Sequence, residues 1–210
     1  GNLWLAAFGG GVERCNPVTE EFFHIYNLPD DPNTLSNNEM TSILVQSDEV
    51  IWAGTNWGLN RIKMNGDDFQ VTRILQVEGD STTIPDNLIH DIYEDRKGRI
   101  WIASNGGLSL FNETEESYTT FNTEDGLPSA EVLADFEGPD NDFWISTSKG
   151  LSRMKESPEG FSFKNYDGGD GLQGDIFYRG SYTVHNGIVY VGGTNGFNYF
   201  SPEDVVSNQD

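Results

Sequence analysis

The stretch Ile100-Trp101-Ile102-Ala103-Ser104-Asn105-Gly106-Gly107-Leu108 decides the fold, because its pattern recurs at four other places in the chain. The aromatic residues at the centre of the five copies are about 43 to 49 residues apart, at Trp4, Trp52, Trp101, Trp144 and Tyr190. In four copies a glycine follows the aromatic residue at the same distance, at Gly58, Gly107, Gly150 and Gly196. The chain is therefore a repeat protein.

The period and the local pattern together indicate the architecture. A repeat of this length belongs either to arrays of helical pairs or to the blades of a β-propeller. Short runs of Trp, Ile, Val and small residues, bounded by Gly, Asn and Asp, favour strands. No window of helical length keeps a 3.6-residue apolar period. The sequence predicts an all-β protein, a β-propeller of four-stranded antiparallel blades.

Each repeat is expected to hold strands A to D, counted from the propeller centre outward, and the first repeat lacks strand A. The predicted strands are 3–7, 11–16 and 21–26; 41–46, 50–55, 59–64 and 69–77; 88–94, 99–104, 108–111 and 117–121; 131–137, 142–147, 151–155 and 161–166; and 181–185, 188–193 and 197–200. The corresponding repeat units are about 1–38, 39–85, 86–129, 130–175 and 176–204, and 205–210 is expected to start a linker to a further domain.

Strand B is apolar on both faces, as a strand must be when neighbouring sheets cover it on both sides. The tryptophan is then expected to be a packing wedge between blades. Between strands A and B, Asp95-Arg96-Lys97-Gly98 and His185-Asn186-Gly187 predict tight turns, in which Gly takes positive φ and Asp or Asn bonds the local backbone. The glycine that recurs after the B–C turn has the same explanation.

The composition limits the partners. Thirty-four acidic against twelve basic side chains give a formal charge of -22, which would repel nucleic acid and anionic lipid, so neutral or cationic partners are favoured. The single cysteine, Cys15, excludes an internal disulfide framework and is expected on a strand. No apolar run is long enough to span a bilayer. The chain opens within a repeat motif, which we interpret as the mark of a piece of a longer protein.

Several segments resemble the two-component regulator propeller repeat. They are Asp31-Pro32-Asn33-Thr34-Leu35-Ser36-Asn37-Asn38, Glu94-Asp95-Arg96-Lys97-Gly98-Arg99-Ile100-Trp101-Ile102 and Glu124-Asp125-Gly126-Leu127-Pro128-Ser129. Asp170-Gly171-Leu172-Gln173-Gly174-Asp175-Ile176-Phe177, followed by Gly192-Gly193-Thr194-Asn195-Gly196-Phe197-Asn198-Tyr199-Phe200-Ser201-Pro202, resembles the closing blade of such sensors.

The resemblance implies the periplasmic sensor region of a hybrid two-component system, which recognises an oligosaccharide and activates polysaccharide-utilisation genes. Members of this family carry seven-bladed propellers, so the chain would hold about four and a half blades from the C-terminal part of one. A membrane helix and a histidine kinase would follow in the parent chain, and this chain itself would have no enzymatic activity and no cofactor.

An Asp-box glycosidase is an alternative interpretation, matched best by Asp95, Gly98 and Trp101. Its substrate carboxylate would need convergent arginines, but Arg61 and Arg153 occupy equivalent repeat positions and are interpreted as features of the blade. No pair of acids stands out as general acid and base. The three histidines, His24, His90 and His185, lack metal-ligand spacing and are expected to have packing or surface roles.

A sugar site is expected on the propeller face formed by the D–A connections and the B–C turns, because loops on a rigid scaffold carry recognition. Stacking on aromatic rings and a few amides or charges are the expected contacts. Comparing equivalent turn positions between repeats makes Trp57 the first candidate for a sugar-binding residue. The alternative is that its ring packs against a neighbouring loop. The full set of candidates is Trp57, Phe8, Asn56, Asn105, Lys149, Asn195, Tyr178 and Arg179, and turn geometry alone would also explain the asparagines.

Two functional hypotheses remain open. In the first, an oligosaccharide binds this face and changes the relation between two propellers or two protomers of a homodimer. In the second, the blades form a scaffold for dimerisation and signal relay. An incomplete propeller exposes the apolar faces of its terminal blades. We therefore expect isolated chains to pair through those ends or to contract into a closed five-blade ring.

Overall fold

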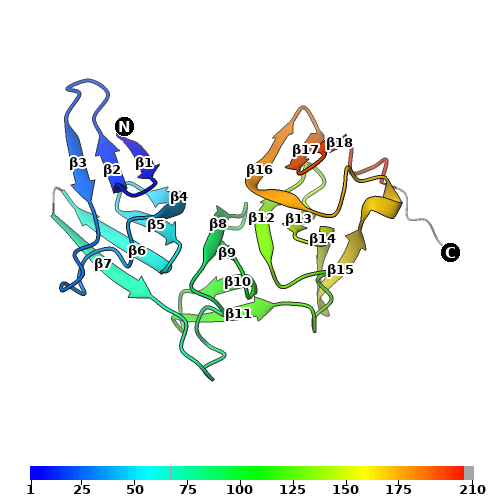
Figure 1. The fold of residues 1–210 in the computed structure, drawn as a ribbon, viewed down its shortest axis with the longest axis horizontal. Helices are drawn as coiled ribbons and strands as arrows, with labels where there is room; N and C mark the ends of the chain where they lie inside the picture. Colours follow the sequence, from blue (N-terminus) through cyan, green and yellow to red (C-terminus); the bar gives the residue numbers. More distant parts are fainter. Residues whose placement is uncertain (67, 206–210) are drawn as a thin grey trace.

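The computed structural model describes residues 1–66 and 68–205, and these residues form five antiparallel sheets that follow one another along an open arc (Figure 1). The first and last sheets each have three strands, and the three sheets between them have four. The closed five-blade ring is wrong, because Figure 1 shows the first and last sheets separated by the opening of the arc. The last five residues of the expected linker lie outside the described residues.

The strands follow the predicted order in every blade. Blade 1 holds β1 (Leu3–Ala7), β2 (Gly11–Cys15) and β3 (Phe22–Ile25), and blade 2 holds β4 (Met40–Ser47), β5 (Val50–Thr55), β6 (Gly58–Asn65) and β7 (Asp68–Ile74). Blade 3 holds β8 (Ile89–Glu94), β9 (Ile100–Ser104), β10 (Gly107–Asn112) and β11 (Ser117–Phe121), and blade 4 holds β12 (Val132–Glu137), β13 (Phe143–Thr147), β14 (Gly150–Ser157) and β15 (Gly160–Tyr166). Blade 5 holds β16 (Phe177–His185), β17 (Ile188–Gly193) and β18 (Gly196–Phe200).

Two predicted boundaries are wrong by three or more residues, and the others differ from the structure by at most two. Strand β7 ends at Ile74, three residues before the predicted end. Strand β16 begins at Phe177 instead of residue 181, and its register against β17 shifts between Phe177 and Tyr182. The four additional residues were predicted as loop because the shift interrupts the alternation of apolar and polar side chains. A short 3-10 helix, η1 (Gly168–Asp170), also precedes this strand.

The tryptophans act as wedges between blades, as predicted. Trp52, Trp101 and Trp144 are fully buried, and each joins a hydrophobic cluster with residues of the next blade. Trp4 is partly buried against the corresponding cluster between blades 1 and 2. The arc therefore has four small cores, one at each junction, in place of one central core.

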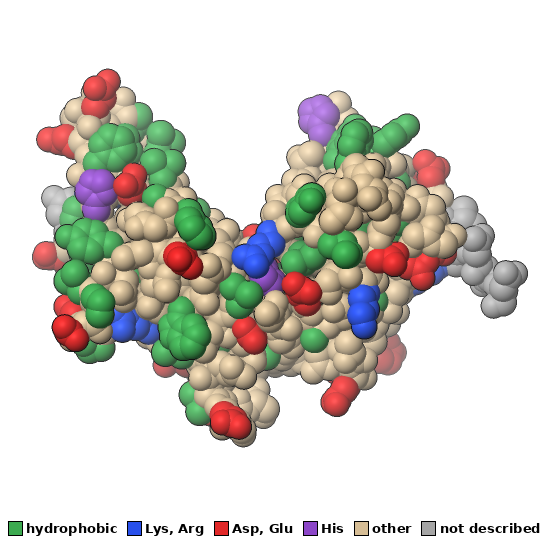
Figure 2. Space-filling view, viewed as in Figure 1, with side chains coloured by type: hydrophobic (Ala, Val, Ile, Leu, Met, Phe, Trp, Pro, Cys, Tyr) green, Lys and Arg blue, Asp and Glu red, His purple; other side chains and the backbone are tan. Residues whose placement is uncertain are grey.

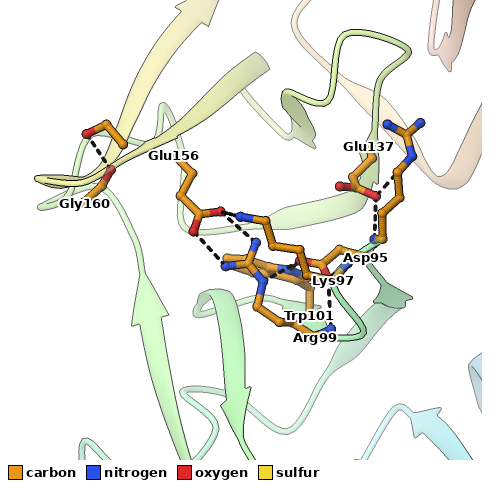
Figure 3. A network of polar contacts seen from close by, with 9 residues as sticks. Asp95, Lys97, Arg99, Trp101, Glu137, Glu156 and Gly160 are labelled. Carbon is orange, nitrogen blue, oxygen red and sulfur yellow. Dashed lines mark hydrogen bonds and ion pairs between the residues drawn. The ribbon is translucent and has the colours of Figure 1, made fainter.

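Charged side chains join blades 3 and 4 around one of these wedges (Figure 3). The Asp95 carboxylate accepts hydrogen bonds from the Trp101 indole at 3.0 Å and from Arg99 Nε at 2.6 Å. Arg99 and Lys97 both extend to Glu156 of the next blade, at 2.9 and 2.8 Å. This network connects the A–B turn of one blade to strand C of the next.

The glycine of the B–C turn is required for two reasons. Gly107 has a φ of 142°, which side chains rarely adopt. A Cβ at this position would also collide with the carbonyl oxygen of Phe121 on the adjacent strand. The turn can therefore lie close against the neighbouring strand only without a side chain.

Candidate functional site

One face of the arc carries the B–C turns and the D–A connections, and we call it the turn face. A recurring backbone hydrogen bond builds it, in which an amide of the B–C turn donates to a carbonyl just before strand A. The bonds run from Asn56 to Glu39, from Asn105 to Leu88, from Ser148 to Glu131 and from Thr194 to Ile176. The side chains of the turns are therefore held beside the inner ends of the blades.

Three aromatic candidates are exposed on this face. Phe8 is 76 % exposed, Trp57 is 59 % exposed and Tyr178 is 57 % exposed. Phe8 forms an isolated β-bridge with Glu39, and the Asn56 side chain donates to the same glutamate at 2.7 Å. Phe8, Asn56 and Trp57 thus lie together around the start of β4. The packed role considered for Trp57 does not fit its exposure.

The centre of the face holds a second group of residues. His90, near the start of β8, is buried, and its Nε2 lies 2.9 Å from Asn105 Oδ1. Burial lowers the pKa of His90, the bond to Asn105 opposes that effect, and the charge of Arg179 lowers the pKa further. Of the candidates, Asn105 therefore contacts this histidine directly, and Arg179 acts on it through its charge.

The remaining candidates lie further along the face. The Lys149 side chain is exposed, and its backbone amide donates to Thr147 Oγ1 at 3.1 Å within the turn. The Asn195 amide donates to Gln173 Oε1 at 2.7 Å. Tyr178 and Arg179 lie on β16 and not in the long connection where they were predicted, because that strand begins earlier.

The open side of the arc is hollowed. Figure 2 shows the molecule hollowed between its first and last sheets, with hydrophobic side chains on both sides and basic and histidine side chains at the base. Five cavities of about 320 to 770 Å³ are lined without any of the eight candidates. An open surface of this kind suits an extended ligand that contacts several blades.

Sequence comparison missed His90, Glu39 and Glu131 as residues of this face. Equivalent positions were compared only in the B–C turns. In the pairing of strand A with strand B, His90 of blade 3 occupies the position that Thr41, Leu133 and Tyr178 occupy in blades 2, 4 and 5. Comparing the first residues of strand A between repeats would have marked His90 as different from its equivalents.

The two arginines considered for an Asp-box hydrolase belong to the blades. Arg61 bonds Glu113 of the next blade at 2.8 Å and lies over the Trp52 ring. Arg153 bonds Asp140 and Asp142 at 2.5 Å each and lies over the Trp144 ring. They are at separate junctions and do not converge. Among the described residues, no group of three or more His, Cys, Asp or Glu side chains is placed to hold a metal ion.

The sheet order, the wedge tryptophans and the turn face define the class of the protein as a β-propeller array. Residues 83–106 match the model of the two-component regulator propeller family.

One curated relative is histidine kinase P4 of Formosa agariphila, which is 25% identical over 172 residues. The match covers 61% of this chain and 13% of the kinase, so the chain corresponds to a small part of that relative.

Solved structures share the fold. The extracellular domain of a putative one component system from B. thetaiotaomicron has a TM-score of 0.67 at 20% identity, over 98% of this chain and 35% of that one. The extracellular domain of a putative hybrid two component system from the same organism has a TM-score of 0.60 at 20% identity, over 97% and 32%. Virginiamycin B lyase from Staphylococcus aureus has a TM-score of 0.61 at 13% identity, over 95% and 66%. Because this last neighbour is an enzyme, the fold alone does not decide the function.

Proposed function

We propose that this chain is part of the extracytoplasmic, periplasmic sensor region of a hybrid two-component histidine kinase. The matched repeat family, the histidine kinase relative and the extracellular domains among the structural neighbours support the proposal. Among the described residues, no helix is both long and apolar enough to cross a membrane. The kinase and any membrane anchor belong to the parent chain.

The ligand that we propose is an oligosaccharide, whose binding activates genes for polysaccharide utilisation. The observation that carries this proposal is the set of exposed rings on the turn face, Phe8, Trp57 and Tyr178. Exposed aromatic rings beside amides and charged groups match the apolar faces and hydroxyl groups of sugar rings.

A thermal-shift panel of neutral and acidic oligosaccharides tests the proposal on this chain. A ligand at a hundred times its Kd should stabilise the protein by about 2.7 kcal/mol, a rise in Tm of about 5 to 10 °C. Trp57→Ala should abolish the shift. Tyr199→Ala removes an equally exposed ring outside the turn face and should leave the shift intact.

The second candidate function is a scaffold for dimerisation and signal relay, without ligand binding by these blades. The exposed apolar side chains at both ends of the arc, among them Leu3 and Phe197, favour it. A chain that responds to no saccharide and associates through its ends would support the scaffold and exclude the sensor site. A shift that persists in Trp57→Ala would place the sugar elsewhere on the chain.

A further inference from the structure

A cavity of about 470 Å³ lies at the junction of blades 2 and 3, and none of the eight turn-face candidates lines it. Strands β6 and β7 of blade 2 and strands β10 and β11 of blade 3 contribute its walls, together with the connection between the two blades. Both blades have four strands, so no missing strand accounts for the space. Ligand pockets commonly have volumes of about 300 to 1,000 Å³.

The neighbouring junctions fill the corresponding space with aromatic rings. At the junction of blades 1 and 2, Phe69 packs edge-on against Phe23, with ring centroids 5.7 Å apart. At the junction of blades 3 and 4, Phe161 packs in the same way against Phe121, at 5.1 Å. Counted from the paired residues of strands C and D, the blade 3 equivalent of Phe69 and Phe161 is Glu116. The ring is therefore absent at the junction where the cavity lies.

Two side chains of the cavity wall have buried polar atoms without a hydrogen-bond partner among the described residues. Tyr118 is 7 % exposed, and its hydroxyl group is one of them. Burial raises the pKa of Tyr118, and the charge of Arg61 only opposes this effect, so the hydroxyl stays protonated and can donate. The second atom is Nε of Arg61, whose Nη2 donates to Glu113 at 2.8 Å. Buried polar groups of folded proteins usually have partners, so these two donors indicate a place for a bound acceptor.

Lys63 adds a further positive charge to the lining. In the part of the chain that the structure describes, Lys63 has no hydrogen bond and no ion pair, whereas Nζ of its blade 4 equivalent, Lys155, lies 3.5 Å from an aspartate. Arg73 also lines the cavity, but its guanidinium donates to the Thr34 carbonyl at 2.6 Å. Glu116 is the acidic residue of the lining. In a chain with thirty-four acidic and twelve basic side chains, a wall with more basic than acidic residues favours an anionic ligand.

We propose that this cavity binds a small aromatic carboxylate. The ring of the ligand takes the place that a phenylalanine fills at the neighbouring junctions, and it contacts Phe111 and the exposed Leu75 and Val77 of the walls. The carboxylate accepts hydrogen bonds from the Tyr118 hydroxyl and the Lys63 ammonium group. This site is independent of the proposed sugar site, because the turn-face candidates do not line it.

The test uses matched probes that differ in charge or in the ring. Calorimetric titration of this chain compares phenylacetate with phenylacetamide, and indole-3-acetate with indole-3-acetamide. We expect at least one acid to bind about five- to tenfold more tightly than its amide, because hydrogen bonds to a charged acceptor are stronger. Acetate, which has the charge without the ring, should show no binding at the same concentrations.

Substitutions in the walls then place the probe in the cavity. Thr72→Phe introduces a ring at the position that Phe23 occupies in blade 1, and it should abolish binding by filling the space. Tyr118→Phe removes the buried hydroxyl, a group without a partner, so the protein should fold normally. It should weaken binding of the acid about tenfold and leave the amide unchanged.

The two equivalent lysines separate a local effect from the overall charge. Lys63→Gln should weaken binding of the acid about two- to fivefold. Lys155→Gln removes the same charge at the equivalent position of blade 4, outside the cavity lining, and should have no effect.

The outcomes separate this inference from the proposed function. Equal binding of acid and amide would overturn the carboxylate, and binding that survives both Thr72→Phe and Tyr118→Phe would overturn the assignment to this cavity. An equal loss in Lys63→Gln and Lys155→Gln would reduce the effect to bulk charge, and no binding of either acid would overturn the inference. Trp57→Ala should leave binding of the acid unchanged, so the sugar site is tested separately by the saccharide panel.

Discussion

At the scale of single residues, Asp91 and Asp135 are two buried carboxyl groups whose surroundings disfavour the charged form. They lie on the neighbouring inner strands β8 and β12, and both are buried. Asp91 accepts a hydrogen bond from Ser42 at 3.1 Å, whereas both carboxylate oxygens of Asp135 lack a partner. Burial raises the pKa of Asp91 to about 6, and burial together with the charge of Asp91 raises the pKa of Asp135 well above its usual value.

These raised pKa values predict how stability depends on pH. An aspartate has a pKa of about 3.9 in an unfolded chain, so the folded state holds its protons more tightly. The contribution of the pair is therefore fully present below about pH 4 and is lost as the pH rises through the folded pKa values. Asp135→Asn should increase the free energy of unfolding at pH 7.5 by about 1 to 3 kcal/mol and have little effect at pH 4.

Urea denaturation at several pH values measures this effect. Asp30→Asn is the matched control, because it removes the same charge from an exposed position. If Asp135→Asn and Asp30→Asn have equal effects, the buried pair is not the cause. A destabilised Asp135→Asn at pH 7.5 would contradict the prediction.

At the scale of elements, the A–B turn of blade 3 is built on Asp95. Its carboxylate accepts hydrogen bonds from the amides of Lys97 and Arg99, both at 2.9 Å, as well as from the Arg99 and Trp101 side chains. Burial raises the pKa of Asp95, but the bonds from Trp101 and Arg99 and the charge of Arg99 outweigh burial, and the pKa is lowered. In blade 2, within the described residues, the side chain of the equivalent Gln46 accepts a hydrogen bond only from Trp52, at 2.9 Å.

Asp95→Ala should therefore destabilise the chain by about 2 to 4 kcal/mol at neutral pH, since it leaves the buried Trp101 indole and Arg99 without their acceptor. The stability that a lowered pKa provides is present above about pH 3.9 and is lost as the pH falls through the folded value. The difference between the wild type and Asp95→Ala should accordingly narrow below pH 4. Asp95→Gln introduces the residue type that blade 2 has at this position, and it should recover part of the lost free energy of unfolding, as measured by urea denaturation. If it recovers none, the hydrogen bonds to the turn amides carry the effect.

At the scale of the whole molecule, the two ends of the arc each expose one half of a blade junction. Leu3 of blade 1 is 55 % exposed, whereas Ile51, at the same position in blade 2, is fully buried. Phe197 of blade 5 is 64 % exposed, whereas the equivalent Leu108 of blade 3 is fully buried. Exposed apolar patches of this kind favour association.

We expect the isolated chain to associate through these end faces as its concentration rises. Leu3→Lys or Phe197→Lys should shift the equilibrium towards monomer in light scattering coupled to size-exclusion chromatography. Val18→Lys, at an exposed position on the β2–β3 turn, is the control and should leave association unchanged. A wild-type chain that stays monomeric at all concentrations would contradict the expectation.

The sequence by itself determined the blade, because the physics of a blade is local and repeated. Trp52 and Trp101 stand at fixed positions in an apolar strand, and Gly107 follows at the turn that excludes a side chain. These patterns predicted the strand order, the wedges and the face on which turn side chains gather. The boundary at Phe177 failed because a register shift has no periodic signal.

Only the tertiary structure decided which residues from different blades meet. Asp91 of β8 acts on Asp135 of β12 because the inner strands of blades 3 and 4 lie against each other, and the charge of Arg179 on β16 acts on His90 of β8. The open arc was likewise not decided by the repeat, since each junction is satisfied by its two neighbours alone. Repeat spacing specifies local contacts, whereas contacts across the centre depend on the curvature that successive junctions accumulate.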